Sequence, residues 1–239
     1  MHRFCRLPLE FDPARLQEDL ARVALSRWVP HYVPSNYAGE WSAIPLRSVG
    51  GQADHALPDP AASLEAYRDT PILAECDYLQ QVLASFHCPV ASARLLKLAA
   101  GSHIKEHTDH DLSANQGWAR LHVPLVTHAR VEFYVESERV VMGEGECWYI
   151  DASLPHRLAN PGPVDRIHLV FDCRVNDWLR QQMADAGYRP RELGYFEARG
   201  VQEQSVASVI AALRGMGTET GDRLAAELEQ KRMEMGERQ

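Results

Sequence analysis

The chain has 239 residues, of which 45% are hydrophobic and 24% charged, a composition typical of one large globular domain or one domain with an appendage. Its formal net charge of -8 at pH 7 gives it no general attraction to nucleic acid or to an anionic membrane. No stretch approaches the roughly 18 apolar residues that a membrane-spanning helix needs, so we expect neither nucleic-acid nor membrane partners.

The N-terminal segment lacks the apolar run that a signal peptide requires. The five cysteines are an odd number and form no CxxC pair. Such scattered cysteines favour reduced, mostly buried thiols over a disulfide framework. We therefore expect a cytoplasmic protein.

Two helices are expected before the middle of the chain. Asp12 followed by Pro13 is a typical helix start, with an N-cap side chain and then proline at the first helical position. The apolar residues that follow share one face, which predicts a helix over residues 13–26. Residues 28–62 are rich in proline and glycine and should form loops and short strands. The periodicity then predicts a second helix over residues 71–86.

Short strands separated by turn signals are expected from Ala91 to Cys173. The predicted strands are Arg94–Leu98, Ala119–Val126, Val131–Glu136, Arg139–Met142, Glu146–Ile150 and Arg166–Cys173. Several short antiparallel strands at close spacing are typical of a sandwich or barrel such as a jelly roll. Helical periodicity returns afterwards, over residues 175–186, 202–214 and, weakly, 221–239.

Three residues suggest a metal site. His107 and Asp109 are two residues apart, so both would point to the same side of a strand. His156 comes much later and lies just after a predicted strand, where a barrel opening would place it. Two imidazoles and one carboxylate on one face of an octahedron leave room for a bidentate cosubstrate and O₂, as in non-haem Fe(II) oxygenases. The His-x-Asp spacing alone is a weak signal, because a chain with 11 histidines can produce it by chance.

Two further features support this hypothesis. Arg166 lies ten residues after His156 at the start of an apolar strand. A guanidinium group can hold a carboxylate with two parallel hydrogen bonds, although an arginine considered alone could equally form a surface salt bridge. Arg120 and His122 share one face of their strand, and alternation leaves open whether that face meets a cavity or solvent.

The chain resembles the aspartyl/asparaginyl beta-hydroxylase family over about residues 30–175. Within the family it is most similar to the small bacterial members, which include hydroxylases of free amino acids such as L-proline. The resemblance is carried by the stretches GEWSAIPLRS, RLLKLAAGSHIKEHTDHD, WARLHVPLVTH and GEGECWYIDASLPHRLANPGPVDRIHLVFD.

The resemblance implies a jelly roll that binds Fe(II) and 2-oxoglutarate and reacts with O₂. Carried over by position, His107 and His156 match the two histidine ligands of the family. Arg166 matches the arginine that binds 2-oxoglutarate. Arg120 and His122 match the Arg-x-His pair that faces cosubstrate and substrate.

Asp109 narrows the expected chemistry. The bacterial amino-acid hydroxylases that the chain resembles have a carboxylate at this position, animal members lack it, and in halogenases its loss opens a halide site. We therefore expect a dioxygenase that hydroxylates an amino-acid-like small molecule and releases succinate and CO₂, with His107, Asp109 and His156 as its catalytic metal ligands.

The expected fold is mainly β with flanking helices. Its core would be a double-stranded β-helix (jelly roll, cupin-like) with N-terminal helices and a C-terminal helical tail. We expect the oxygenase domain to cover residues 1–175 and the helical extension to cover residues 176–239.

Two other readings remain open. The segment from Gly143 to Asn160 also resembles the second half of a cupin motif, with His156 and Asn160 spaced as His-x3-Asn. A cupin-like metal-binding protein could be a sensor, an isomerase or a dioxygenase that uses no 2-oxoglutarate. However, the first half of the motif, HxH followed by Glu, is absent. The third reading is a binding module whose site has lost its activity.

The substrate is not defined by the sequence. Arg94, Arg47 and Arg120 could each bind a substrate carboxylate, and surface salt bridges explain the first two equally well. The substrate could be a free amino acid, a carrier-bound intermediate or a protein side chain. The tail from Val201 onward could cap the site, mediate a homodimer, or do neither.

Overall fold

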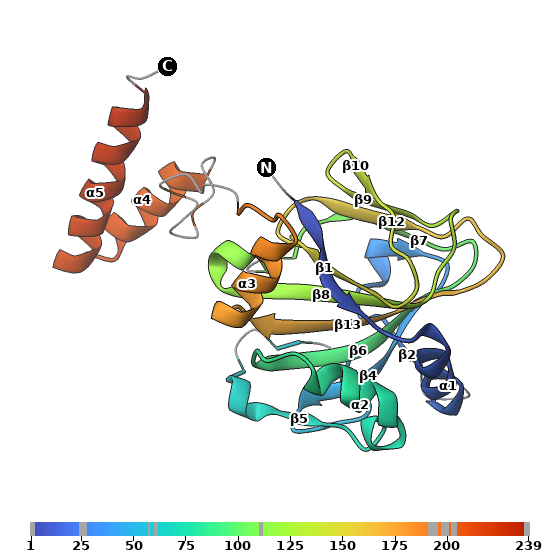
Figure 1. Cartoon of the computed structure of the whole chain (residues 1–239). Coiled ribbons are helices and arrows are strands. Elements are labelled where there is room, and N and C mark those ends of the chain that lie inside the picture. Colours follow the sequence, from blue (N-terminus) through green and yellow to red (C-terminus); the bar gives the residue numbers. More distant parts are fainter. Residues whose placement is uncertain are drawn as a thin grey trace. The chain divides into compact units, whose positions relative to one another are not determined.

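The chain divides into two compact units, Met1–Pro190 and Arg191–Gln239. We describe each unit by itself (Figure 1). Within the described residues, the helices are all too short or too polar to cross a membrane. The computed structural model describes residues 3–23, 28–56, 58–59, 62–109, 112–190, 196, 201 and 205–236.

The first unit is built on an eight-stranded sheet whose neighbouring strands are all antiparallel. The strand order is β1-β11-β8-β13-β6-β4-β2, and β5 pairs with β4. In chain order the strands are β1 (Phe4–Glu10), β2 (Val29–Pro30), β4 (Trp41–Val49), β5 (Tyr67–Asp69), β6 (Val90–Leu98), β8 (Trp118–Val126), β11 (Glu146–Ile150) and β13 (Arg166–Arg174).

A smaller sheet of five antiparallel strands faces the large one, in the order β10-β9-β12-β7-β3. Apolar side chains from both sheets pack between them, including Leu98 of the large sheet and Phe133 of the small one. This arrangement is the predicted jelly roll (Figure 1). The strands of the small sheet are β3 (Tyr37–Ala38), β7 (His103–His107), β9 (Glu132–Val135), β10 (Glu138–Val140) and β12 (His156–Ala159).

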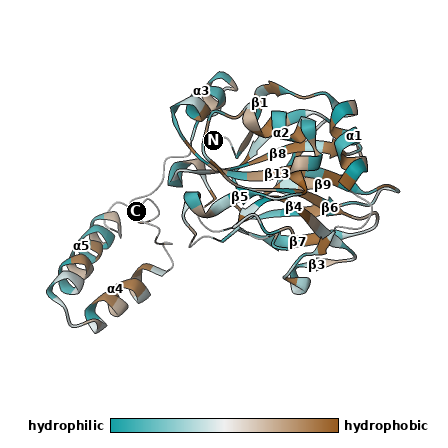
Figure 2. Cartoon of the chain, turned by 90° about the horizontal axis from the view of Figure 1, so that it is seen from below, coloured by the Kyte–Doolittle hydropathy of each residue, from teal (hydrophilic) through white to brown (hydrophobic). Residues whose placement is uncertain are grey.

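Three helices belong to the first unit: α1 (Pro13–Val23), α2 (Asp77–Ala84) and α3 (Asp177–Asp185). Their buried residues, among them Leu16 and Leu79, form the main core together with the large sheet. Figure 2 shows mainly hydrophobic colouring along the central strands of this sheet, whereas α1 carries much hydrophilic colouring. The helices thus cover one face of the large sheet and leave its other face to the interior between the sheets.

Strand alternation gives the central strands two different faces. On β13, Leu169 and Phe171 belong to the core beneath the helices. Arg166, His168 and Asp172 are out of phase with them and are also buried. Because β13 is buried on both faces, its polar residues point into the interior between the sheets.

Four 3₁₀ turns accompany these elements: η1 (Pro34–Asn36), η2 (Leu64–Ala66), η3 (Leu73–Glu75) and η4 (Ala114–Gln116). The helix predicted over residues 71–86 is therefore divided into η3 and α2. The buried carboxylate of Asp19 on α1 accepts hydrogen bonds of 2.8 Å from the backbone N–H groups of both Tyr78 and Leu79. Asp19 thus caps α2 from another helix, a contact that local sequence does not reveal.

The second unit contains α4 (Val206–Gly215) and α5 (Glu219–Gly236). Val206 and Ile210 of α4 pack against Ala225 and Leu228 of α5. Helices were expected over residues 202–214 and, weakly, 221–239, of which residues 202–204 and 237–239 lie outside the described part.

The strands predicted from alternation are confirmed within a few residues, and β11 has the predicted bounds. The helix predicted over residues 13–26 is observed as Pro13–Val23, and residues 24–26 lie outside the described part. The helix predicted over residues 175–186 is α3, which contacts β1 of the first unit. The compact units divide after Pro190 rather than after residue 175, so the predicted division into two functional domains remains a prediction.

Candidate active site

The small sheet brings two histidines together that are far apart in the sequence. His107 ends β7 and His156 begins β12, and the two residues are direct partners in the antiparallel pairing of these strands. Their ring centroids lie 4.2 Å apart. His156 was expected just after a strand, whereas it is the first residue of one.

Asp109 completes the cluster. Its backbone N–H donates to the carbonyl oxygen of Ala152 at 2.9 Å. One ligand atom from each of His107, Asp109 and His156 lies within 4.8 Å of the others. The predicted geometry needs one correction: β7 ends at His107, so Asp109 reaches the cluster from the following loop rather than from the same strand.

Both imidazole rings are held in the form that binds metals. Nδ1 of His107 lies 2.8 Å from the carbonyl oxygen of Lys105, and Nδ1 of His156 lies 2.9 Å from that of Leu154. Because a carbonyl oxygen can only accept, each Nδ1 must carry the proton. Nε2 is then the nitrogen that each ring can offer to a metal, which is the arrangement usual for histidine ligands. Burial, together with His107, lowers the pKa of His156 to about 4.

The carboxylate of Asp109 is ionised. Burial acts to raise its pKa, but Arg120 and the two histidines outweigh burial and hold the pKa below its usual value. Arg120 forms an ion pair with Asp109 through Nη1. The cluster thus offers two imidazole nitrogens and one anionic carboxylate oxygen.

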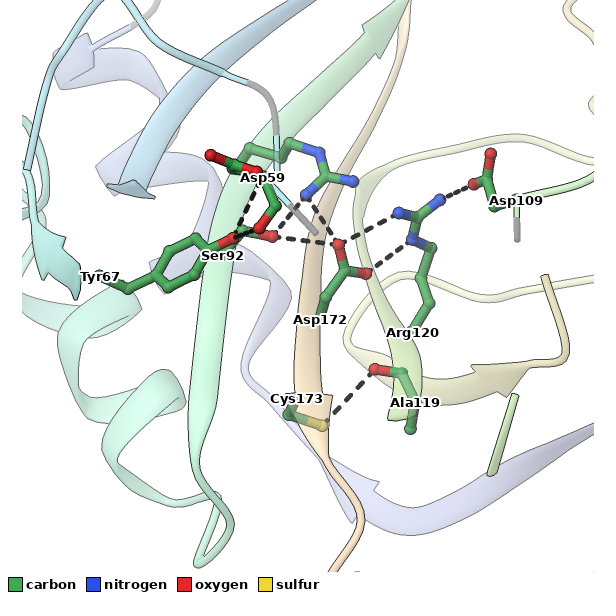
Figure 3. A network of polar contacts seen from close by, with 9 residues as sticks. Asp59, Tyr67, Ser92, Asp109, Ala119, Arg120, Asp172 and Cys173 are labelled. Carbon is green, nitrogen blue, oxygen red and sulfur yellow. Dashed lines mark hydrogen bonds and ion pairs between the residues drawn. The ribbon is translucent and has the colours of Figure 1, made fainter. Parts of the chain in front are cut away.

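Behind Asp109 lies a buried network of charges (Figure 3). Arg120 donates from Nε and Nη2 to the carboxylate of Asp172 at 2.7 and 3.1 Å. Asp172 also accepts from Arg94 at 3.2 Å and from Ser92 at 3.0 Å. Burial acts to raise the pKa of Asp172, but Arg120 and Arg94 together lower it well below the usual value. Arg120 is therefore committed to two carboxylates, of which one belongs to the metal cluster.

Arg166 is a different kind of cation. It is only 3% exposed, and burial alone lowers its pKa to about 9. Its Nη2 donates to Nδ1 of His168 at 2.6 Å, and its Nε has no hydrogen-bond partner among the described residues. No carboxylate of the described part forms an ion pair with it. A buried guanidinium without a counter-charge is a site for an anionic ligand.

The cluster and the arginines share one cavity of about 300 Å³. The cavity is lined by all six residues singled out in the sequence: His107, Asp109, Arg120, His122, His156 and Arg166. Periodicity had left open whether Arg120 and His122 face solvent, and both line the cavity. His122 is buried, and Nδ1 of its ring has no partner among the described residues.

The structure separates the arginines that were considered for a substrate carboxylate. Arg94 and Arg120 line the cavity. Arg47 instead pairs with Asp69 at 2.6 Å and donates to the carbonyl oxygens of Val90 and Tyr67. The alternative of a salt bridge is therefore correct for Arg47.

Sequence reasoning missed several residues in or behind the cavity. Asp172 lies six residues after Arg166 on the same face of β13. This even spacing along the strand was the one feature of the sequence that could have identified it. His31 stacks on Trp41 with ring centroids 3.5 Å apart and planes within 8°, and both line the cavity. Burial, followed by the charge of Arg94, lowers the pKa of His31 to about 4.

The His-x3-Asn spacing that suggested a cupin has a structural explanation. The side-chain nitrogen of Asn160 donates to the carbonyl oxygens of Leu98 and Val164 at 3.0 and 2.9 Å. Its side-chain oxygen lies 3.0 Å from Nε2 of His128. Asn160 therefore ties a turn to neighbouring strands, and it belongs neither to the His-Asp-His cluster nor to the cavity lining.

The family model described as aspartyl/asparaginyl beta-hydroxylase matches residues 12–175. L-proline cis-4-hydroxylase of Rhizobium meliloti (strain 1021) is 31% identical over 169 residues, covering 69% of this chain and 58% of that protein. L-proline cis-3-hydroxylase 2 of a Streptomyces species is 27% identical over 173 residues, covering 69% of this chain and 57% of that protein. The matched part thus spans less than two thirds of the length of either relative.

Among solved structures, an oxidoreductase of the 2OG-Fe(II) oxygenase family from Burkholderia pseudomallei is similar with a TM-score of 0.48. It is 12% identical, and the match covers 73% of this chain and 86% of that chain. A likeness at this level carries no argument about activity.

Proposed function

Because this chain belongs to the aspartyl/asparaginyl beta-hydroxylase family, we propose that it is an Fe(II)- and 2-oxoglutarate-dependent dioxygenase. It would hydroxylate a C–H bond of an amino acid or an amino-acid-derived substrate. The observation that carries this proposal is the cluster of His107, Asp109 and His156 at the wall of a cavity that is also lined by Arg166, which forms no ion pair with a described residue.

The residues present fit Fe(II). Two imidazole nitrogens and one carboxylate oxygen are the donor set of non-haem Fe(II) oxygenases, in which the remaining positions stay open. In His107 and His156, Nδ1 donates to a backbone carbonyl oxygen, so Nε2 is the nitrogen that each ring can offer to the metal. Arg120 engages Asp109 and so holds the orientation of its carboxylate.

The residues present also fit 2-oxoglutarate. Its distal carboxylate would bind Arg166, whose buried Nε has no acceptor among the described residues. His122 borders the same space and has a ring nitrogen without a partner in the described part. Bound together, Fe(II) and 2-oxoglutarate supply the activation of O₂ for hydroxylation, with release of succinate and CO₂. The protein holds both groups, orients the substrate and excludes water.

The test is succinate formation after O₂ is admitted to protein mixed anaerobically with Fe(II), 2-oxoglutarate and a panel of free amino acids that includes L-proline. We expect succinate above background, and the His107→Ala variant should form none above protein-free controls. His103 lies on the same strand, is exposed and stands outside the cluster, so His103→Ala is the matched control and should behave as wild type. Equal succinate from wild type and His107→Ala would refute the assignment.

The same experiment tests the cupin-like alternative. A cupin-like metal-binding protein would bind a metal at His107, Asp109 and His156 without any dependence on 2-oxoglutarate. We expect instead that adding 2-oxoglutarate to the Fe(II)-loaded protein produces a weak charge-transfer absorption in the visible range. Metal binding with no such band and no succinate would favour the cupin-like reading.

The cellular compartment and the partners of the enzyme are also proposals. All five cysteines are buried and none forms a disulfide, which is typical of a reducing compartment such as the cytoplasm. A small amino-acid-like molecule is the proposed partner, without nucleic acid or membrane. Whether the helices of the second unit form a homodimer is tested by the oligomeric state of the purified chain in solution.

A further inference from the structure

A second cavity of the first unit adjoins the candidate active site. It has a volume of about 380 Å³, which is in the range typical of small-ligand sites. Arg166 and Phe133 line both cavities, whereas the three residues of the metal cluster line only the first. The second cavity is thus a separate space that meets the active site at one cation.

The wall of the second cavity is mainly apolar. Its apolar side chains come from β9, from β10 and from the segments that flank this pair of strands: Ala129, Val131, Phe133, Val140, Val141 and Met142. Val141 is 64% exposed, so the apolar wall extends to the protein surface. A ligand with an apolar body would cover this wall and remove it from water.

Two polar side chains of the lining already have partners. Nε2 of His128 lies 3.0 Å from the side-chain oxygen of Asn160, and its Nδ1 accepts from the N–H of Arg130 at 3.2 Å. The carboxylate of Glu144 accepts from the N–H of Thr127 at 3.2 Å. Neither His128 nor Glu144 therefore requires a ligand to satisfy its hydrogen bonds.

His168 also lines this cavity, and it differs from these two residues. Its Nδ1 accepts from Nη2 of Arg166 at 2.6 Å. Burial, followed by the charge of Arg166, holds the pKa of His168 well below its usual value, so the ring is neutral and its single proton lies on Nε2. This Nε2 is buried and has no hydrogen-bond partner among the described residues. Because a buried N–H without an acceptor is costly, the site favours a ligand that supplies one.

Arg166 determines which charge this ligand should carry. Burial lowers the pKa of Arg166 only to about 9, so the group is a cation at pH 7. No carboxylate of the described part forms an ion pair with it. An anionic head on Nε2 of His168 would lie across the same imidazole ring from this cation and would partly balance its charge. The ligand that complements the cavity has one anionic head and an apolar body.

We propose that the second cavity binds an aliphatic monocarboxylate, with its carboxylate on Nε2 of His168 and its chain against the apolar wall, and that this ligand antagonises 2-oxoglutarate. The antagonism rests on the proposed function, which assigns the distal carboxylate of 2-oxoglutarate to Arg166. Two carboxylates would then share one cation and repel each other. Each ligand therefore lowers the affinity for the other by the same factor.

The first test compares three probes by calorimetric titration of the full chain loaded with Fe(II) under anaerobic conditions. Hexanoate has both the anionic head and the chain, acetate lacks the chain, and 1-hexanol lacks the charge. We expect hexanoate to bind at least about 10-fold more tightly than acetate or 1-hexanol, because only hexanoate uses both the wall and the buried donor. The absence of hexanoate binding, or equal affinity for hexanoate and 1-hexanol, overturns the inference.

The second test uses Val141→Asp, a substitution at an exposed position that should not impair folding. It places a negative charge on the apolar wall, so the affinity for hexanoate should fall at least about 5-fold. Val164→Asp is the matched control, because Val164 is an exposed valine that lines neither cavity. It should leave the affinity for hexanoate as in wild type. Equal affinities in the two variants would mean that hexanoate binds elsewhere, and the inference would be wrong.

The third test measures the antagonism. The charge-transfer band of the Fe(II)-loaded chain is titrated with 2-oxoglutarate at increasing concentrations of hexanoate. The apparent Kd for 2-oxoglutarate should rise at least about 3-fold, and the same concentrations of hexanoate should raise it less in Val141→Asp. An apparent Kd that stays constant while hexanoate saturates its site would refute the antagonism.

The outcomes also separate this inference from the proposed function. If hexanoate binds and Val141→Asp weakens its binding, but no charge-transfer band forms with 2-oxoglutarate, the proposed function fails and the second site stands. If the band and succinate both form but hexanoate does not bind, the inference fails and the proposed function stands.

Discussion

At the scale of single residues, Arg120 links the metal cluster to the buried charges behind it. It contacts Asp109 on one side and Asp172 on the other. Asp172 is 4% exposed at its side chain, so solvent screens these interactions very little. The position of the metal carboxylate thus depends on a second carboxylate that touches no ligand.

Replacing Asp172 by Asn should destabilise the protein in a pH-dependent way. The variant leaves Arg94 and Arg120 without their shared counter-charge, which should lower the free energy of unfolding at pH 7 by about 3–5 kcal/mol. Because the pKa of Asp172 in the folded state is held below its usual value, its contribution is present above about pH 4, the unfolded pKa, and is lost as pH falls below it. Urea unfolding from pH 7 to pH 2 should show the difference from wild type shrinking with acid, and a constant difference would contradict this account.

Replacing His168 by Phe should weaken the binding of 2-oxoglutarate. His168 accepts a hydrogen bond from Arg166 and so positions the guanidinium group without touching the proposed cosubstrate. Losing this acceptor should raise the KM for 2-oxoglutarate about 10-fold and change kcat less. His168→Asn restores an acceptor and should recover part of the loss. A larger effect on kcat than on KM would argue against a positioning role.

At the scale of elements, the pairing of β7 with β12 brings His107 and His156 together, and the turn before β11 joins segments of the large sheet and of the chain before α1. Gly145 lies in this turn and joins three segments. Its carbonyl oxygen accepts from Phe11 at 2.8 Å, and its N–H donates to the carbonyl oxygen of Pro124 at 2.9 Å. Its φ of +78° is a conformation that glycine adopts freely.

Gly145→Ala should destabilise the protein more than Gly101→Ala. Both glycines have a φ of +78°, but a Cβ at Gly145 would collide with the backbone of Phe11, whereas nothing lies within 4 Å of a Cβ at Gly101. The shared backbone strain costs about 1–2 kcal/mol in either variant. The collision should cost Gly145→Ala roughly another 2 kcal/mol, because a backbone atom must move. If thermal unfolding shows equal losses of stability for the two variants, the turn accommodates the added side chain at Gly145.

The elements that sequence predicted best are those buried on at least one face. The strands β8, β11 and β13 alternate between the helix-covered core and the interior, so their periodicity identified them. The short strands β7 and β12 of the small sheet were missed. In β7 the sequence His-Ile-Lys-Glu-His has a single buried side chain and no clear alternation.

Strand β4 lies within residues 28–62, for which loops and short strands were expected, and its length of nine residues was not predicted. Pro45 lies in the middle of this strand, where it cannot donate a backbone hydrogen bond to the sheet. The register of β4 against β6 shifts between Pro45 and Arg47, and such an irregularity accommodates a proline within a strand. The proline and glycine content of the segment therefore did not indicate a strand of this length, which is paired with β6.

The residues of the candidate site were predicted from the sequence, but the contacts that hold these residues in place were not. His107, Asp109, His156 and Arg166 followed from spacing and resemblance, and the structure gathers them in one cavity. The partners that hold them, such as Asp172 behind Arg120, depend on which strands become neighbours. A single sequence carries no direct signal of those tertiary contacts.

At the scale of the whole molecule, all residues that line the cavity belong to the first unit, Met1–Pro190. The second unit has its own small core between α4 and α5. We therefore propose that binding of the metal and of 2-oxoglutarate requires only the first unit.

A chain that ends after Pro190 tests this division. We expect it to bind Fe(II) and 2-oxoglutarate with affinities within about twofold of those of the full chain, since each compact unit keeps its own core. The full chain, measured in parallel, is the reference. A truncated chain that remains folded by circular dichroism but loses the charge-transfer band would show that the helical unit contributes to the site.

The most direct measurement of the central claim is an anaerobic titration of the full chain with Fe(II) in the presence of excess 2-oxoglutarate, followed by visible absorption. The account predicts a charge-transfer band that saturates at one Fe(II) per chain, disappears in His107→Ala and His156→Ala, and persists in His103→Ala. A band that survives in both cluster variants, or its absence from the wild-type chain, would contradict the assignment of His107, Asp109 and His156 as the iron site.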